Sequence, residues 1–352
     1  MDDNGKRIGL VTGKFAPLHT GHLHLINKAA TMVDVLYVVL SYDEFLYPGD
    51  KVLTLKNRMR WLKTCLAHLP HAVVTYVKED GMPSYPDGWV QWAEAVQTLL
   101  RQEPYNVAPH QVDKIFSSEP EYTEGFKTHW PQATHVVVDH ARTMVPVSAS
   151  KIRENPYKYW GYLPPIVRAN YVKRVCFIGT ESCGKTTLSR SLASMFNTEW
   201  VEEYGRVFCE RELMMDETLL QQSDYGLLAA RRYELEHQAT LRANRVLFVD
   251  TNAFITNFYS YLYDRTYNAL VHEYEKIESY DITFIMSDDV PWVEDGLRKN
   301  TDRKYTSQAF AKSLRMAGNN KFGEVHEIRG DYEQRMSAVL STLAKAGIKC
   351  SY

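Results

Sequence analysis

Short apolar runs alternate with amphipathic stretches throughout the first half of the chain. The runs are rich in aliphatic and β-branched residues, which favour strands, and they cover 7–13, 35–42, 72–77, 114–118 and 135–139. Between them the pattern predicts helices from Gly21 to Val33, from Thr54 to Leu69 and from Trp89 to Arg101. Continuous apolar strands that alternate with helices are typical of a parallel sheet covered by helices on both faces.

An aromatic and proline-rich segment, NPYKYWGYLPPIVR at 155–168, interrupts this alternation. A second series of apolar runs follows it, at 174–179, 245–250, 281–288 and 324–330. The chain of 352 residues is long enough for two domains of ordinary size. We therefore predict two α/β parallel-sheet domains, at residues 1–165 and 166–352.

Composition and charge narrow the class of protein. The formal net charge is −2, and without a basic excess no nucleic-acid partner is expected. Binding of small anionic ligands remains compatible with this charge, because it needs only local positive charge. The sequence contains five cysteines without a CxxC pair, no signal peptide and no apolar run long enough to cross a bilayer. These features favour a cytoplasmic protein without a membrane-inserted segment, although a membrane-bound partner is not excluded.

The loop after the first predicted strand, GKFAPLHTGH at 13–22, carries the first candidate site. Ligands of open α/β sheets bind beyond the carboxyl ends of strands, and free amides at a helix start favour anions. His19 and His22 can donate ring N–H groups to phosphate oxygens, and Lys14 can add positive charge. One alternative is zinc, because His24 is also close, but acidic and thiol ligands are missing nearby. The other is a polar turn with surface histidines.

A second polar segment, VSASKIRENP at 147–156, follows the last strand of the same predicted domain. Ser148 and Ser150 can cap the next helix, which places Lys151 and Arg153 at its start. Together, GKFxPxHxGH and the Ser-x-x-x-x-Arg spacing resemble the nucleotidylyltransferase superfamily, whose HxGH and ISSTxxR-type motifs bind ATP. The resemblance implies a Rossmann-like fold and in-line attack of a phosphate oxygen on the α-phosphorus of ATP, with release of pyrophosphate. It assigns ATP binding to Gly13, Lys14, Phe15, His19, His22, Ser148, Ser150 and Arg153, with both histidines catalytic.

The segment GTESCGKT at 179–186 matches the P-loop pattern GxxxxGK[ST] between a predicted strand and a predicted helix. In such a loop consecutive amides bind phosphates, the lysine reaches the β and γ oxygens, and the threonine holds Mg²⁺. The pattern predicts ATP binding by Gly179, Glu181, Ser182, Gly184, Lys185, Thr186 and Thr187. The strand RVLFVD ends at Asp250, whose carboxylate can hold Mg²⁺ or take the acceptor's proton.

Two tryptophans follow a turn-rich stretch and have two interpretations. Trp89 and Trp92 are spaced i, i+3, so they share one helix face. That face is either part of the core or an aromatic wall for a heteroaromatic ring.

Four residues of the second half are also candidates for the site, three of them with two interpretations each. Glu203 is either a ribose ligand or catalytic base, or part of a charged helix start. Arg298 follows an Asp-Gly turn and is a candidate lid arginine that closes onto phosphates. Trp292 and Tyr332 are either stacking partners of a ligand or core residues.

Both halves also resemble the NadR-type family of nicotinamide mononucleotide adenylyltransferases and ribosylnicotinamide kinases. The stretch at 79–96, FSSEP at 116–120 and YWGYLP at 159–164 carry the resemblance in the first half. EYGRVF, FVDT and WVEDGLR carry it in the second, where it implies a P-loop kinase fold. It implies substrate binding by Glu79, Asp80, Gly81, Trp89, Trp92, Ser117, Ser118, Glu119, Glu203, Tyr204, Trp292 and Tyr332. It also implies kinase catalysis by Lys185, Glu203, Asp250 and Arg298, with Mg²⁺ held by Thr186 and Asp250.

The function implied by this resemblance is bifunctional NAD salvage. The second domain would phosphorylate nicotinamide riboside with MgATP, and the first would adenylylate nicotinamide mononucleotide, with NAD as product or bound ligand. Two alternatives stay open: a flavin kinase and adenylyltransferase pair, and an NAD-sensing regulatory protein with weak catalysis. A functional link to a nicotinamide riboside transporter and a homo-oligomer are compatible with the sequence. Some family members carry a DNA-binding helix-turn-helix, which is not expected here because the chain starts almost at its first strand.

Overall fold

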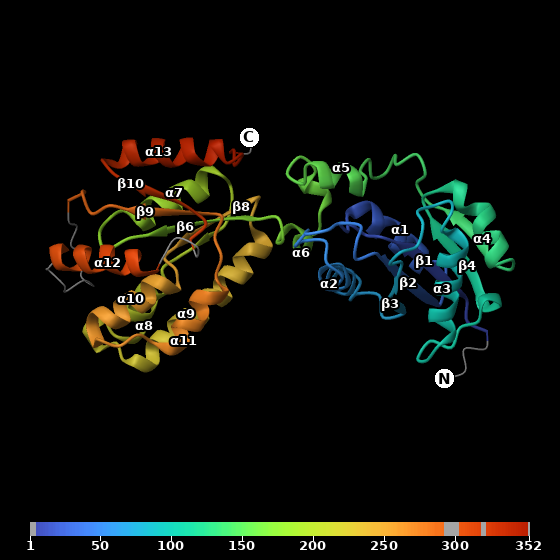
Figure 1. Cartoon of the computed structure of the whole chain (residues 1–352), viewed down its shortest axis with the longest axis horizontal. Helices are drawn as coiled ribbons and strands as arrows, with labels where there is room; N and C mark the ends of the chain where they lie inside the picture. The colour runs from blue at the N-terminus through green and yellow to red at the C-terminus, as the bar shows by residue number, and fades with distance from the viewer. Residues whose placement is uncertain (1–4, 292–302, 318–321, 351–352) are drawn as a thin grey trace. The chain divides into compact units, whose positions relative to one another are not determined.

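The computed structural model describes residues 5–291, 303–317 and 322–350. The chain divides into two compact units, Met1–Tyr171 and Val172–Tyr352. Each unit is an α/β body with a five-stranded sheet of its own (Figure 1). All strand pairs within the two sheets are parallel. The predicted fold class, two parallel-sheet α/β domains, is therefore confirmed.

The sheet of the first unit has the strand order β3-β2-β1-β4-β5. Its strands are β1 (Ile8–Gly13), β2 (Val35–Tyr42), β3 (Ala72–Lys78), β4 (Val112–Ser117) and β5 (Thr134–Val137). Its helices are α1 (Thr20–Ala30), α2 (Leu55–Cys65), α3 (Trp89–Arg101), α4 (Thr123–His129), α5 (Ala149–Glu154) and α6 (Pro165–Arg168). The order reverses between β1 and β4, and the crevice beyond such a reversal is where open α/β sheets bind ligands.

The core of the first unit explains why its strands read as continuous apolar runs. Leu10 and Val11 of the central strand β1 are fully buried, although their side chains point to opposite faces of the sheet. On one face, Ile8, Leu10 and Val39 pack with residues of α3 and α4, among them Val96 and Phe126. A strand covered on both faces needs apolar side chains at every position.

The sheet of the second unit has the order β10-β9-β6-β8-β7. Its strands are β6 (Lys173–Ile178), β7 (Trp200–Val201), β8 (Val246–Asp250), β9 (Ile282–Met286) and β10 (Glu324–Ile328). Its helices are α7 (Lys185–Met195), α8 (Tyr204–Glu212), α9 (Gln222–Arg242), α10 (Ala253–Asp264), α11 (Ala269–Ile277), α12 (Arg303–Ala317) and α13 (Tyr332–Lys345). Helices α7 and α13 pack on one face of this sheet, and α8 to α11 gather on the other side (Figure 1).

The boundaries of the first two helices differ slightly from the predicted ones. Their starts are set by capping side chains. The first helix begins at Thr20, because His19 caps it, and it ends at Ala30 rather than Val33. The second begins after Thr54, whose side chain accepts the amide hydrogen bond of Asn57, and it ends at Cys65 rather than Leu69. Periodicity of apolar residues continues past both helix ends, so it overestimates their length.

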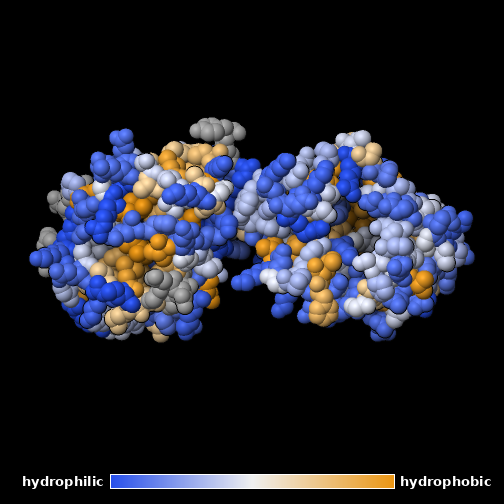
Figure 2. Space-filling view, turned by 45° about the horizontal axis from the view of Figure 1, so that its top comes forward, coloured by the Kyte–Doolittle hydropathy of each residue, from blue (hydrophilic) through white to orange (hydrophobic). Residues whose placement is uncertain are grey.

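The surface drawn in Figure 2 is mostly hydrophilic on both units, with hydrophobic residues gathered in smaller patches. Within the described part of the chain, no helix combines the length and the apolar character that crossing a membrane requires.

Candidate active sites

The start of α1 in the first unit is built around His19. The amide of Gly21 donates to His19 Nδ1 over 3.1 Å, so the proton of the neutral ring sits on Nε2. A Cβ atom on Gly21 would lie 2.9 Å from the Cε1 atom of His19. Glycine is therefore needed for the ring to fold back over the helix start and present Nε2–H as a donor.

His19 and His22 form a buried stacked pair. Their ring centroids are 3.7 Å apart with an interplanar angle of 24°. Burial, and secondarily the positive charge of Arg142, lowers the pKa of His19 to about 4. Burial, then His19 and Arg142, lowers the pKa of His22 well below its ordinary value. Both rings are therefore neutral donors at neutral pH.

These histidines line a cavity that we call the histidine pocket, at the β1–β4 edge of the sheet. It brings together many predicted residues from separate segments: Gly13, Phe15, His19, His22, Ser117, Ser118, Glu119, Ser148 and Ser150. Ser148 caps α5 and accepts from the amide of Lys151, as the sequence suggested. The predicted ATP segments 13–22 and 147–156 thus meet at one cavity, which also contains Ser117 to Glu119, expected at the acceptor site.

Lys14 and Arg153 differ from the predicted arrangement, in which both neutralise the triphosphate. Arg153 donates to the carbonyl oxygen of Ala16 over 2.5 Å and to Ser150 Oγ over 3.0 Å. Its guanidinium also lies over the ring of Tyr47, 5.1 Å from the centroid. Among the described residues neither Lys14 nor Arg153 lines the histidine pocket. Through these bonds Arg153 links α5 to the loop at 13–22.

A second cavity, the tryptophan pocket, adjoins the first. Its lining includes Lys14, Ser41, Asp43, Glu79, Met82, Pro83, Ser84, Tyr85, Trp89, Trp92, Tyr122 and Phe126. Thr12, Gly13 and Tyr122 line both cavities, so the two are contiguous. The ring centroids of Trp89 and Trp92 are 5.0 Å apart, and Trp92 Nε1 donates to Ser41 Oγ over 3.0 Å.

The two interpretations of the tryptophan pair are compatible. Trp89 and Trp92 pack against the core of the first unit and also line the tryptophan pocket. Asp80 and Gly81, predicted as substrate ligands, lie outside this lining among the described residues. Asp80 instead accepts from the amide of Glu44 over 2.9 Å, and Gly81 has φ +76°, a turn conformation. The turn shapes the loop, and its neighbours Met82 to Ser84 supply the pocket wall.

In the second unit, the P-loop between β6 and α7 has the backbone geometry that its glycines permit. Gly179 has φ +154°, and a Cβ atom there would lie 2.7 Å from the carbonyl oxygen of Met286. Gly184 has φ +84°. Lys185 is buried and its Nζ donates to the carbonyl oxygens of Gly179 and Thr180 over 3.1 and 2.8 Å. The lysine charge thus lies inside the loop that would surround phosphates.

Thr186 and Asp250, the two residues that the sequence predicts to hold Mg²⁺, lie within hydrogen-bond distance of each other. Thr186 Oγ1 donates to Asp250 Oδ2 over 2.5 Å. Burial, and next the charge of Glu203, raises the pKa of Asp250 to about 6. Among the described residues there is no cluster of three or more His, Cys, Asp or Glu side chains arranged to hold a metal. One carboxylate and one hydroxyl fit Mg²⁺, which takes its other ligands from phosphates and water.

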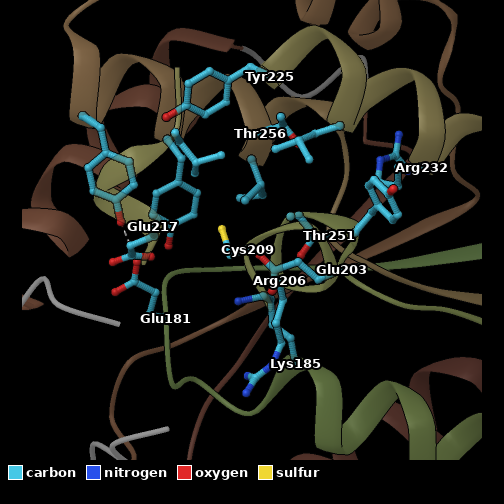
Figure 3. Close-up of a pocket in the computed structure, with 17 residues that line it drawn as sticks. Glu181, Lys185, Glu203, Arg206, Cys209, Glu217, Tyr225, Arg232, Thr251 and Thr256 are labelled. Atoms are coloured by element: carbon cyan, nitrogen blue, oxygen red, sulfur yellow. Dashed lines mark hydrogen bonds between the residues drawn. The ribbon is translucent and has the colours of Figure 1, made fainter. Parts of the chain in front are cut away.

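The inner pocket, shown in Figure 3, opens beside Lys185 and is lined by residues of α8, α9 and α10. Its lining includes Glu181, Lys185, Glu203, Tyr204, Arg206, Glu217, Tyr225, Arg232, Thr251, Tyr259 and Tyr263. The rings of Tyr259 and Tyr263 are stacked, with centroids 5.7 Å apart. Tyr263 donates to Glu181 Oε1 over 3.1 Å. The lining thus combines aromatic rings with both acidic and basic side chains.

A further cavity, the outer cavity, lies along the P-loop and shares Lys185 and Arg206 with the inner pocket. It is lined by Ser182, Gly184, Lys185, Thr186, Thr187, Arg206, Tyr332 and Arg335, among others. Tyr332, predicted as a substrate-binding residue, lines this outer cavity; among the described residues it is not part of the inner pocket. The start of α13 places it there. Trp292 and Arg298 lie outside the described residues.

Three arginines that line these pockets were not predicted from the sequence motifs. Arg335 is buried and donates to the carbonyl oxygens of Cys183 and Ser287, so it ties the P-loop to the end of β9. Arg142 lines the histidine pocket, and Arg206 lines both pockets beside the P-loop. Arg206 follows Glu203 and Tyr204 within EYGRVF, which was a usable signal. Nothing in the local sequence marks Arg335.

The fold and sites define a class of protein, a nucleotidylyltransferase-like domain followed by a P-loop domain. Accordingly, the family described as Cytidylyltransferase-like matches residues 10–155, and the family described as AAA domain matches residues 174–335. The chain is 34% identical over 350 residues to the trifunctional NAD biosynthesis/regulator protein NadR of Salmonella typhimurium, covering 94% of this chain and 81% of that protein. It is 34% identical over 347 residues to the protein of the same name from Escherichia coli, with the same coverage of 94% and 81%. The chain belongs to the NadR family.

Solved structures give the same result over the whole chain. A crystal structure of NadR protein in complex with NR has a TM-score of 0.79 and 26% identity, covering 99% of this chain and 98% of that one. A crystal structure of NadR protein in complex with NAD and AMP-PNP has a TM-score of 0.78 and 26% identity, with the same coverage of 99% and 98%.

Proposed function

We propose that this protein is a bifunctional enzyme of NAD salvage. The second unit phosphorylates nicotinamide riboside with ATP, and the first unit transfers the adenylyl group of ATP to nicotinamide mononucleotide, which gives NAD and pyrophosphate. The observation that carries this proposal is the presence of both site types, a histidine pocket and a P-loop, in one NadR-family chain. The product of the kinase is the acceptor of the adenylyltransferase.

In the adenylyltransferase, the chain's residues position two phosphates and stabilise charge. ATP occupies the histidine pocket, where His19 Nε2–H donates to a triphosphate oxygen as charge builds on it. The mononucleotide occupies the contiguous tryptophan pocket, with the ring stacked on the wall of Trp89 and Trp92. Its phosphate oxygen then attacks the α-phosphorus in line, and the gain comes from proximity and orientation.

In the kinase, the P-loop and the inner pocket bind the two substrates on either side of Lys185. Lys185 stabilises charge on the β and γ oxygens of ATP. Glu203 lines the inner pocket and is assigned as the base that takes the proton from the riboside 5′ hydroxyl. Asp250 is assigned to Mg²⁺ with Thr186, because its carboxylate is already bonded to that hydroxyl. When bound, Mg²⁺ supplies charge neutralisation at the transferred phosphoryl group.

We place both activities in the cytoplasm. All five cysteines are free thiols, which supports a reducing compartment.

Mass-spectrometric product analysis with nicotinamide riboside and MgATP tests this function. Nicotinamide mononucleotide should form first and NAD second, with ADP and pyrophosphate as the co-products. Riboflavin offered in parallel is the matched control for the flavin alternative. Conversion of riboflavin without consumption of the riboside would overturn the proposal, and so would tight NAD binding without turnover of either substrate.

A further inference from the structure

The proposed function places the triphosphate of ATP in the histidine pocket, but the cations predicted to neutralise it do not line that pocket. Lys14 lines the tryptophan pocket, and Arg153 is bonded to the Ala16 carbonyl and to Ser150. Burial keeps His19 and His22 neutral near pH 7. Among the described residues, Arg142 is the one lysine or arginine side chain in the lining of this pocket.

The loop that carries Arg142 is fixed by an acidic side chain. Asp139 accepts from the amides of Thr143, Met144 and Val145 over 2.8, 3.2 and 3.2 Å. The amide of Arg142 closes a turn onto the carbonyl oxygen of Asp139 over 2.9 Å. This loop leads directly into the Ser148 cap of α5, so the position of Arg142 is set by the same segment that forms the second half of the pocket.

The partner of Arg142 is Glu119, a half-exposed carboxylate in the lining of the same pocket. Arg142 Nη2 donates to Glu119 Oε1 over 3.2 Å, and the two side chains are 44% and 34% exposed. Ion pairs with this exposure contribute little to stability. A triphosphate carries more charge than one carboxylate and accepts a bidentate guanidinium, so exchange of Glu119 for a polyphosphate is favourable. Arg142 is also close enough to both histidines for its charge to lower their pKa values.

We propose that Arg142 binds the polyphosphate of ATP, and the pyrophosphate product, in the adenylyltransferase site, with Glu119 as its counter-ion when no polyphosphate is bound. This proposal rests on the proposed function of the first unit and extends it by one residue. The histidines then supply hydrogen bonds, and Arg142 supplies the charge.

Steady-state kinetics of Arg142→Ala test the proposal, with exposed Arg60→Ala as the matched control. The KM values for ATP, and for pyrophosphate in the reverse reaction, should rise about tenfold or more, as loss of a charge-assisted hydrogen bond requires. The KM for nicotinamide mononucleotide should stay within twofold, and Arg142→Lys should recover part of the loss. Unchanged KM values for ATP and pyrophosphate in a variant with native melting temperature would overturn the proposal. An equal rise for all three substrates would also overturn it, because that pattern indicates a structural role.

Glu119→Gln tests the counter-ion. It should leave the affinity for ATP equal or higher, and a tenfold loss would overturn the assignment of Glu119. Calorimetric binding of inorganic pyrophosphate separates this inference from the proposed function because it needs no turnover. The comparison is between Lys185→Ala and the double variant Lys185→Ala/Arg142→Ala, so that the P-loop does not contribute to pyrophosphate binding in either protein. Weaker binding after Arg142→Ala supports the site even if adenylyl transfer is absent, and equal binding overturns it.

Discussion

At the scale of single residues, hydrogen-bond donors and positive charges reach the histidine pocket in different ways. His19, His22 and Ser148 are where the HxGH and Ser-x-x-x-x-Arg spacings place them, because both motifs are local to a strand–loop–helix start. The cations could not be placed the same way. A lysine or arginine side chain can reach several groups, and tertiary contacts turn Arg153 toward Ala16 while Arg142 comes from a loop without a motif.

The buried histidine pair makes the first unit sensitive to acid. Burial, helped by Arg142, lowers the pKa of His19 from 6.5 to about 4. Between about pH 6.5 and pH 4, His19 is therefore protonated in the unfolded chain but neutral in the folded unit. The free energy of unfolding should fall as the pH drops through this range. At about 1.4 kcal/mol per pKa unit, His19 alone accounts for about 3 kcal/mol.

Melting temperature against pH checks this prediction. His22→Asn should flatten the profile below pH 6.5, because one buried ring no longer resists protonation. His110→Gln, at an exposed position, is the control and should keep the wild-type profile. If the histidine-pocket variant retains the full acid sensitivity, another group is responsible.

At the scale of elements, strand order and helix contacts decide what the sequence pattern leaves open. Apolar runs predicted every strand except the two-residue β7, because continuous burial needs such runs, but they did not predict which strands are neighbours. The dual role of Trp89 depends on α4, since α3 and α4 pack together beside the tryptophan pocket. Similarly, the pattern could not separate Tyr332 from the inner pocket, because the start of α13 carries it to the outer cavity beside the P-loop.

The contact between α3 and α4 can be tested at Gly125. A Cβ atom there would lie 2.4 Å from Cε2 of Trp89, so Gly125→Ala must displace the indole. We expect the KM for nicotinamide mononucleotide to rise about fivefold or more, because about 1 kcal/mol of stacking is lost. The KM for ATP should change little.

Gly161→Ala is the control for that variant, since no atom lies within 4 Å of its added Cβ. Gly125 lies inside α4, where alanine would ordinarily stabilise the helix by roughly 0.5–1 kcal/mol relative to glycine if its Cβ met no other atom. A Gly125→Ala protein that is stabilised and binds the mononucleotide normally would show that Trp89 is only a core residue.

At the scale of the whole molecule, two sites belong to two units with separate sheets and cores. Lys185 is in the P-loop of the second unit, and His22 is in the histidine pocket of the first. Lys185→Ala should abolish phosphorylation of the riboside, because the charge on the β and γ oxygens is lost, and leave adenylyl transfer intact. His22→Ala should slow adenylyl transfer about 100-fold or more, as loss of one transition-state donor does, and leave the kinase intact.

A mixture of the two variants tests whether the two sites work independently. Neither alone should convert nicotinamide riboside to NAD at the wild-type rate, but the mixture should, after a lag in which free mononucleotide accumulates to the KM of the adenylyltransferase. The lag should disappear when mononucleotide is added at the start, since that step bypasses the kinase. Each activity is measured separately on the same preparations, with circular dichroism as the check on folding. Loss of both activities in either folded variant would contradict independent sites, because a local change in one unit would then have reached the chemistry of the other.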